Sequence, residues 1–499
     1  MNNVKRVMAL LLAALLCAAS LASCGSESGT PAVTTAAATT ASDTAAETTT
    51  QLKPDVPEDS DFGGYEFKVL TKGQFDIHWK SKDIYAEELN GEPINDAVFN
   101  RNSKIGEKYN FTVSEKVGTS TDASGEAKKA ILAGEEAYDM ILLGSQLNSL
   151  ITGGMLVNLN NIPYIDLTKP WYDQNANASL SIDHKLYVTA GDLMIMDNDA
   201  TWTLLFNKSL AEDLGVGNLY DKVNDGTWTL DALHDCIVNA SRDINGDGVQ
   251  DEFDQWGIEG ESFNTTALIL GAGEHIIAKD DNDLPYIAMQ TERFYTAFEK
   301  ANSINGDFSL CLYAGKYSAK YPDSSLWSDC MDKTFTDGRS LFNFAGLNRV
   351  SLFRTMETDF GIVPIPKFDE NQTEYYNVVS LWCANLLAVP KTASDLERTG
   401  IIIEALSAES MYTLTPAYYD ITLKTKSSRD EQSSDMLDLI FSSRVFDLAN
   451  LFGWGGLFDL AGGQTDSGKN EIASAVEKKL KSAQSAMDKS VNYILEDEG

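Results

Sequence analysis

The sequence predicts an α/β fold with two lobes, and three observations support that prediction. Short apolar runs typical of buried strands alternate with segments in which apolar residues recur at helical spacing. This alternation begins a second time near residue 199. The folded part, roughly 54–499, is long enough to form two hydrophobic cores. Strands that alternate with helices indicate sheets covered by helices on both faces.

The first block of the pattern contains three expected strands and three expected helices. The strands are Tyr65–Leu70, Phe111–Val117 and Tyr138–Leu143. The helices are Ala97–Tyr109, Ala127–Ala133 and Leu147–Leu156. This order favours a sheet that is mostly parallel, because each strand is followed by a helix that can return the chain to the same edge.

The second block adds strands and a helical C-terminal third. The expected strands are Thr201–Phe206, Leu341–Ala345, Phe360–Pro364 and one long strand, Val378–Val389. The expected helices are Lys208–Leu214, one that opens at Leu230, and Leu396–Leu406, Ser434–Arg444 and Asn470–Leu495. Asn207 and Thr229 directly precede helices, and both are residue types that cap helix N-termini.

The N-terminus has the layout of a bacterial secretory signal. Lys5 and Arg6 precede an apolar run, Val7–Leu16, and small residues stand before Cys24. The pattern resembles a lipoprotein cleavage site, which implies a signal peptide over 1–23 and a lipid on Cys24; the alternative is ordinary cleavage with Cys24 unmodified. Residues 24–61 then form a lipidated cysteine and a disordered linker rich in Thr, Ala and Ser.

Composition excludes several classes of function. The chain has 74 acidic and 39 basic residues and a net charge of −35, so nucleic acid and anionic lipid would repel it. Phosphate-loop, strand-linked GxGxxG, GxSxG and HExxH motifs are absent.

No cysteines form a CxxC pair; Cys311 and Cys330 would either pair in an exported protein or remain buried thiols.

A loop of alternating oxygen-bearing residues predicts a structural calcium site. Its side-chain oxygens, one backbone carbonyl and the turn glycine Gly248 have the spacing that a cation with six to eight oxygen ligands requires. The expected ligands are Asp243, Asn245, Asp247, Val249 through its carbonyl, Asp251 and Asp254. Trp256 is placed to cover the loop. The alternative is an acidic surface turn that binds no metal.

Six segments resemble, in order, motifs of the family 1 extracellular solute-binding proteins of bacterial ABC importers. They are Tyr138–Ile141, Gly154–Leu159, Leu204–Lys208, Gly226–Thr229, Gly338–Phe342 and Phe360–Lys367. Phe206 stands where the family has Tyr, and Ala211 stands where it has a larger apolar residue. The stretch Tyr412–Trp454 is similar to a Clostridia-type branch of the family.

The resemblance implies a type II periplasmic-binding-protein-like fold whose lobes are joined by crossing segments near 197–203, 343–347 and 383–388. Lobe I would comprise 62–198 plus 346–384, and lobe II 199–345 plus 385–499. The implied function is that of a monomeric, lipid-anchored protein outside the cell. It would capture a mono- or oligosaccharide by hinge closure and deliver it to the permease subunits, without catalysing a reaction.

The candidate ligand residues are aromatic or polar and fall near expected strand ends and crossings. Binding pockets combine apolar walls with a few placed polar groups, and sugars stack on aromatic rings. The candidates are Ser145, Trp171, Tyr172, Asp173, Asp197, Asn198, Trp202, Gly346, Asn348, Trp382, Tyr418 and Trp454. For each aromatic residue the alternative is core packing; Trp79, Trp228 and Trp256 are assigned to structure.

Two other functions remain compatible with these patterns. One is a surface carbohydrate-active enzyme, which would need a carboxylate pair facing a cleft. The other is an adhesion or scaffold lipoprotein that uses the same fold without transport.

Overall fold

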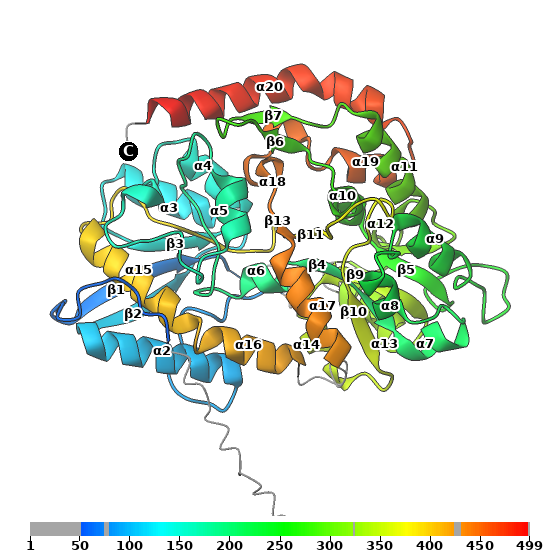
Figure 1. Cartoon of the computed structure of the whole chain (residues 1–499), viewed down its shortest axis with the longest axis horizontal. Coiled ribbons are helices and arrows are strands. Elements are labelled where there is room, and N and C mark those ends of the chain that lie inside the picture. Colours follow the sequence, from blue (N-terminus) through cyan, green and yellow to red (C-terminus); the bar gives the residue numbers. More distant parts are fainter. Residues whose placement is uncertain (1–50, 74–78, 323–324, 424–430, 498–499) are drawn as a thin grey trace, which may run out of the picture. The chain divides into compact units, whose positions relative to one another are not determined.

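A mixed four-stranded sheet organises the first half of the protein. The structure is a computed structural model that describes residues 51–73, 79–322, 325–423 and 431–497 (Figure 1). The strand order is β12-β3-β1-β2, in which β2 (Phe111–Val117) and β3 (Met140–Leu143) are parallel to β1 (Tyr65–Thr71). The last strand, β12 (Leu386–Ala388), pairs antiparallel with β3 although it comes from much later in the chain.

A five-stranded sheet organises the second half, in the order β10-β4-β9-β5-β8. Its strands are β4 (Trp202–Asn207), β5 (Trp256–Gly260), β8 (Cys311–Tyr313), β9 (Ser340–Gly346) and β10 (Phe360–Val363). Strand β4 is antiparallel to both of its neighbours, whereas β5, β8 and β9 are parallel. Two short ribbons complete the strands: β6 (Ile277–Lys279) with β7 (Pro285–Ile287), and β11 (Asn377–Val378) with β13 (Arg444–Val445).

Helices cover the first sheet and its edges. They are α2 (Pro93–Tyr109), α3 (Ala123–Leu132), α4 (Asn148–Ile151), α5 (Gln174–Leu180), α15 (Leu396–Ser410) and α16 (Leu414–Leu423), with short 3₁₀ turns η1 (Ser145–Leu147) and η2 (Leu159–Asn161). Helix α2 packs against β2, α15 and α16. The chain then leaves this half through α6 (Met196–Asp199), directly before β4.

The helices that surround the second sheet are shorter on average. They are α7 (Lys208–Asp213), α8 (Leu219–Asn224), α9 (Leu230–Val238), α10 (Ser262–Gly271), α11 (Glu292–Asn305), α12 (Ala314–Tyr317), α13 (Asp332–Thr336), α14 (Asn348–Leu352) and α17 (Glu431–Ser442), with the π-helix η3 (Leu326–Met331) and the 3₁₀ turn η4 (Phe353–Thr355). The expected caps are confirmed, because the Asn207 side chain accepts from the Leu210 N–H at 3.0 Å and Thr229 accepts from Ala232 at 3.2 Å.

The C-terminal segment spans both halves. It contains α18 (Leu448–Phe452), η6 (Trp454–Gly456), α19 (Leu460–Asp466) and the long helix α20 (Ile472–Glu496). Figure 1 shows α20 running across both halves, and it packs against α11 and α19 of the second one. Just beyond its end, Asp497 accepts a hydrogen bond of 2.8 Å from the Tyr187 hydroxyl in the first half. Within the described residues no helix is long and apolar enough to cross a membrane.

Two predicted elements are wrong in extent. The expected strand Val378–Val389 is divided into β11 and β12, because a turn at Ser380 intervenes: its carbonyl accepts from the N–H groups of Cys383 and Ala384. The expected helix Leu147–Leu156 is reduced to η1 and α4, and Gly154 has a φ of +68°, which a helix cannot contain.

The strand pairing also departs from the predicted division at 346–384 and 385–499. Strand β10, assigned to lobe I by sequence, pairs with β4 in the second sheet. Strand β12, assigned to lobe II, pairs with β3 in the first. Antiparallel pairing lets a strand from late in the chain add to either sheet edge, so segment order alone does not decide the partner. The chain therefore returns from the second sheet to the first between β10 and β12, at 364–385, and not at the predicted crossing 343–347.

The two halves share one hydrophobic core. A single cluster of buried apolar side chains includes Phe67 of β1 and Phe342 of β9, both fully buried. Residues Leu52–Gly499 accordingly form one compact unit. The predicted lobes are thus two sheets with their own helices, joined by continuous packing in this conformation.

A buried arginine fixes the crossing of the C-terminal chain. Arg444, in β13, forms ion pairs with Asp173 at 2.5 Å and Asp197 at 3.1 Å, and its guanidinium donates to the Asn198 side chain at 2.6 Å. The Arg444 side chain is 11% exposed and the two aspartates 5% and 1%. Asp173 directly precedes α5, and Asp197 and Asn198 lie in α6. The Arg444 side chain therefore joins the C-terminal part of the chain to the segment through which the chain leaves the first half.

Replacing Arg444 by alanine is expected to lower the free energy of unfolding by about 3–5 kcal/mol, because it leaves two carboxylates buried without a cation. Urea denaturation of both proteins measures the difference. Lys333→Ala is the control: its pair with Asp337 is exposed, and its loss is expected to cost less than about 1 kcal/mol. Equal effects of the two substitutions would contradict this role for Arg444.

Candidate functional site

A cavity of about 610 Å³ lies where strands of both sheets end. Its wall is built at the carboxyl ends of β3, β5 and β9 and at the turn between β11 and β12, the edge at which open α/β sheets bind ligands. The lining residues are Trp79, Ser145, Asn148, Trp202, Glu261, Phe263, Trp327, Ala345, Gly346, Arg349, Ser380, Trp382, Cys383, Ala449, Asn450, Leu451, Gly453, Phe458 and Asp459.

Aromatic rings form much of this wall. Trp79 and Trp202 are stacked, with ring centroids 6.0 Å apart and an interplanar angle of 6°. Phe263 of α10 packs on Trp202 at 4.7 Å and on Phe458 at 5.8 Å. The Trp202 indole N–H donates to the Asn264 side chain at 2.9 Å, which fixes the ring in place. The result is a preformed apolar wall, in which Trp202 and Trp79 are only 4% and 8% exposed.

Two features extend the aromatic wall. Trp382, on the turn that connects the sheets, is 59% exposed, and the Lys72 ammonium lies 5.1 Å from its ring centroid. Gly346 ends β9 at the stack: a Cβ there would lie 2.6 Å from the Asp199 carbonyl and 2.9 Å from the Trp79 ring. A glycine at this position therefore allows Trp79 to approach the strand.

Carboxylates supply most of the charge in the cavity. Glu261 follows β5 and precedes α10, but its side chain makes no capping bond. Burial raises the pKa of Glu261 to about 7, an effect that Asp466 increases and Arg349 opposes. Burial also raises the pKa of Asp459. Arg349 is itself held by Asp332 at 2.9 Å, so it does not fully neutralise the cavity.

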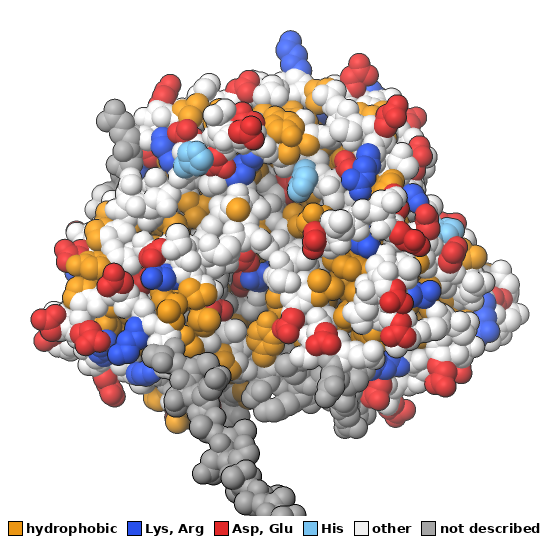
Figure 2. Space-filling view, viewed as in Figure 1, with side chains coloured by type: hydrophobic (Ala, Val, Ile, Leu, Met, Phe, Trp, Pro, Cys, Tyr) orange, Lys and Arg blue, Asp and Glu red, His pale blue; other side chains and the backbone are white. Residues whose placement is uncertain are grey.

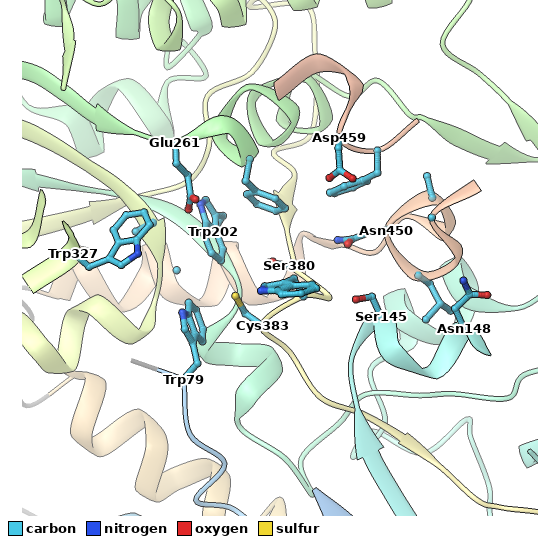
Figure 3. Close-up of a pocket in the computed structure, with 18 of the residues that line it drawn as sticks. Trp79, Ser145, Asn148, Trp202, Glu261, Trp327, Ser380, Cys383, Asn450 and Asp459 are labelled. Atoms are coloured by element: carbon cyan, nitrogen blue, oxygen red, sulfur yellow. The ribbon is translucent and has the colours of Figure 1, made fainter. Parts of the chain in front are cut away.

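The arrangement of these groups is visible in Figure 3. Trp79, Trp202, Trp327 and Glu261 lie on one side of the cavity, and Ser145 and Asn148 lie on the other. In Figure 2, acidic side chains are scattered over the visible face of the molecule. Acidity is thus a general property of the surface, whereas the cavity combines rings with a few carboxylates.

Four predicted ligand residues lie in the cavity wall: Ser145, Trp202, Gly346 and Trp382. Asn348 is buried beside it, where its side-chain oxygen accepts from Arg349 at 3.5 Å. Trp79, which the sequence assigns to structure, is buried in the core and stacks on Trp202, and it also lines the cavity. Glu261 is a lining residue that the sequence does not single out, although it directly follows a short strand, a position that could have identified it.

The remaining aromatic candidates are packed in cores away from the wall. Trp171 is fully buried, and the neighbouring Tyr172 donates its hydroxyl to Glu404 at 2.7 Å. Trp454 stacks on Phe452 at 4.6 Å and donates its indole N–H to Ser490. Tyr418 is 5% exposed and donates to Asp199 at 3.0 Å. Large rings stabilise a core by their buried area, and sequence position does not distinguish that role from ligand stacking.

The polar candidates Asp173, Asp197 and Asn198 do not line the cavity either. All three contact the Arg444 guanidinium instead. Asp173 also caps α5, where its side chain accepts from the Ala176 N–H at 2.9 Å. Asp197 and Asn198 lie in α6, at the crossing where the sequence places them, but the oxygens of all three residues contact an internal cation.

The predicted calcium loop forms a tight turn in which its oxygens accept backbone hydrogen bonds. Asp243 accepts from Gly246 at 2.6 Å and from Gly248 at 2.8 Å, and Asp254 accepts from Ile244 at 3.0 Å. In the part of the chain that the structure describes, no three acidic, His or Cys side chains gather as a metal site. The Trp256 indole donates to the Asp251 carbonyl at 2.8 Å, which confirms its predicted place beside the loop.

Cysteines take no part in cross-links among the described residues. Cys236, Cys311, Cys330 and Cys383 are all buried free thiols, so Cys311 and Cys330 remain unpaired in this structure. Cys24 lies outside the described residues.

Three solved structures with a similar fold are described as sugar-, solute- or substrate-binding proteins. The sugar-binding protein MalE from Xanthomonas citri has a TM-score of 0.57 and 15% identity, over 87% of this chain and 100% of its own. A solute-binding protein from Thermotoga lettingae bound with α-D-tagatose has a TM-score of 0.54 and 12% identity, over 85% and 100%. A substrate-binding protein from Listeria monocytogenes in complex with cycloalternan has the same score and identity, over 85% and 99%.

These comparisons establish the fold. No family model matches the chain, and no curated protein matches it. Because the identities are low, the similarity shows a shared fold alone. That fold is the one of the periplasmic solute-binding proteins, as the sequence predicted.

Replacing Glu261 by glutamine is expected to stabilise the ligand-free protein at pH 8 by about 1–3 kcal/mol. Below about pH 4.5 the Glu261 carboxyl is protonated in both the folded and the unfolded state, so it does not lower the free energy of unfolding. Because burial raises its pKa to about 7 in the folded state, the free energy of unfolding falls as the pH rises from about 4.5 to about 7. Thermal unfolding at pH 4.5 and pH 8 measures the difference. The exposed Glu66→Gln is the control; a gain for Glu261→Gln that is independent of pH would refute this explanation.

Proposed function

We propose that the protein is the substrate-binding component of a bacterial ABC importer, which captures a mono- or oligosaccharide in the aromatic cavity and delivers it to the permease. The observation that carries this proposal is the cavity itself. It joins the ends of both sheets, presents the stacked Trp79–Trp202 pair, and exposes the ring of Trp382. Sugars offer apolar C–H faces to such rings and hydroxyls to nearby polar groups.

The fold supports the same class of ligand. The similar structures from Thermotoga lettingae and Listeria monocytogenes hold tagatose and cycloalternan. The wall also contains polar side chains that can form hydrogen bonds with hydroxyls. They are those of Ser145, Asn148 and Asn450. Binding alone, without bond cleavage, is the role that this resemblance favours.

Hinge closure is the proposed mechanism. The wall combines residues of the first half, such as Ser145, with residues of the second, such as Trp202. A solute that contacts both halves binds the closed form more tightly and so increases its population. The turn around Trp382, which connects the two sheets, is well placed to transmit the movement.

Location follows from the N-terminal sequence. We propose that residues 1–23 are removed and that lipid on Cys24 holds the monomer at the outer face of the cell membrane, with 24–61 as a tether. Two acyl chains on one cysteine are sufficient for stable anchoring.

Binding is tested by thermal shift and tryptophan fluorescence with a panel of neutral mono- and oligosaccharides. A bound sugar raises the melting temperature, and Trp382→Ala is expected to weaken binding by about tenfold, since ring stacking contributes about 1 kcal/mol or more. Tyr286→Ala is the control, because this ring on β7 is also exposed, at 49%, and does not line the cavity. Turnover of a chromogenic glycoside would favour the enzyme instead.

We also propose that the loop Asp243–Asp254 binds structural calcium. Addition of Ca²⁺ is expected to raise the melting temperature, and EDTA to reverse the change, because an ion bound only by the folded state stabilises it. Calorimetry with Ca²⁺ alone measures the affinity. Asp243→Asn is expected to abolish the effect and Asp281→Asn, in another acidic turn, to preserve it; an unaltered response of Asp243→Asn would exclude this site.

A further inference from the structure

A small inner chamber adjoins the aromatic cavity. Its volume is about 10 Å³, and it shares Glu261, Trp327 and Arg349 with the wall of the larger space. A volume of this size holds one water-sized group. The chamber is therefore a side pocket that a single small substituent of a ligand in the main cavity could fill.

Two residues that line the chamber each carry a buried acceptor atom without a partner in the described part of the chain. Glu259 of β5 is 2% exposed, and its Oε2 accepts from the Asn343 side chain at 2.6 Å. Glu259 Oε1 and Asn343 Oδ1 have no hydrogen-bond partner within the described residues. Buried acceptors without a donor are rare, because each loses its hydration without replacement. Both residues line the same void.

The charge around the chamber is unbalanced. Three carboxyls, Glu259, Glu261 and Asp332, line it with one cation, Arg349. Arg349 donates its Nε to Asp332 at 2.9 Å, so that pair is satisfied. Two carboxyls remain without an ion pair of their own. Burial raises the pKa of both, of Glu261 to about 7 and of Glu259 well above its usual value, because desolvation outweighs the opposing charge of Arg349.

We propose that the chamber is an amine subsite, which binds the protonated amino group of an aminated sugar whose ring lies against the tryptophans of the main cavity. This inference rests on the proposed function and names its ligand class. The amino group would donate to Glu259 Oε1, Asn343 Oδ1 and the Glu261 carboxyl.

An ammonium fits these groups better than the alternatives. It has three donors and one positive charge, which match three acceptors and an excess of carboxyls. A sugar hydroxyl brings one donor and no charge, so it would leave acceptors and carboxyls uncompensated. Trp327 lines both spaces, and the Arg349 guanidinium lies 5.6 Å from its ring centroid.

Matched sugar pairs test the proposal in calorimetry at pH 7. Glucose is compared with glucosamine, galactose with galactosamine, and cellobiose with its diamino counterpart, deacetylated chitobiose. The amine is expected to bind at least about tenfold tighter than its hydroxyl partner in one or more pairs, since its hydrogen bonds to the carboxyls are charge-assisted. N-acetylation of the amine, which removes its charge, is expected to abolish the gain.

Two isosteric variants localise the preference. Glu259→Gln, at a residue that lines the chamber and not the main cavity, is expected to reduce the ratio of amine to hydroxyl affinity several-fold while neutral sugars bind with little change. Glu261→Gln is expected to reduce the same ratio, and only the ratio is compared for it because Glu261 also lines the main cavity. Glu404→Gln is the matched control: Glu404 is also a buried acid with a pKa raised to about 7, but it bonds Tyr172 in the first half. Thermal unfolding confirms that each variant is folded.

The outcomes separate the two proposals. Neutral sugars that bind as tightly as their amines, or a preference that survives both glutamine variants, would overturn the amine subsite and leave sugar binding intact. Binding of putrescine without binding of any sugar would overturn the sugar assignment, as would a failure of every sugar to bind.

Discussion

The ion pairs of Arg444 are the constraint on which the arrangement of the two halves depends. A guanidinium and two carboxylates are removed from water at the point where the chain leaves the first sheet and where its C-terminal part returns. Each group is costly to bury alone, so the three must remain together. Because Asp197 stands five residues before Trp202, the same contacts help to fix where β4, and with it the aromatic stack, begins.

The cavity follows from that arrangement. Strands β3, β5 and β9 end at the same place, and the turn around Trp382 passes between them. Glu259 and Glu261 flank Gly260 at the end of β5, so the strand directs carboxyls into both the inner chamber and the main cavity. Burial of these acids opposes folding at neutral pH, as the pKa of Glu261 indicates. Buried acids with shifted pKa values are common at ligand-binding sites.

Local chemistry explains why much of the fold could be predicted. Strand β2 has the predicted bounds, and Asn207 and Thr229 cap the helices that they were expected to cap, because these features depend on neighbouring residues only. The strand predicted over Val378–Val389 failed for the opposite reason. Its apolar residues are buried in two different sheets, and an apolar run does not reveal the turn that separates them.

The sequence by itself determined the α/β class, the caps and the presence of Ser145, Trp202, Gly346 and Trp382 near strand ends. Only the tertiary structure decided which rings form the cavity, because Trp79 and Trp171 have the same hydrophobic preference and differ in what lies beside them. It also decided that Asp173 and Asp197 bind Arg444, a residue almost 250 positions away from Asp197. Stacking and ion pairing act between groups that folding brings together. The spacing of two residues along the chain does not indicate how far apart they lie in the folded protein.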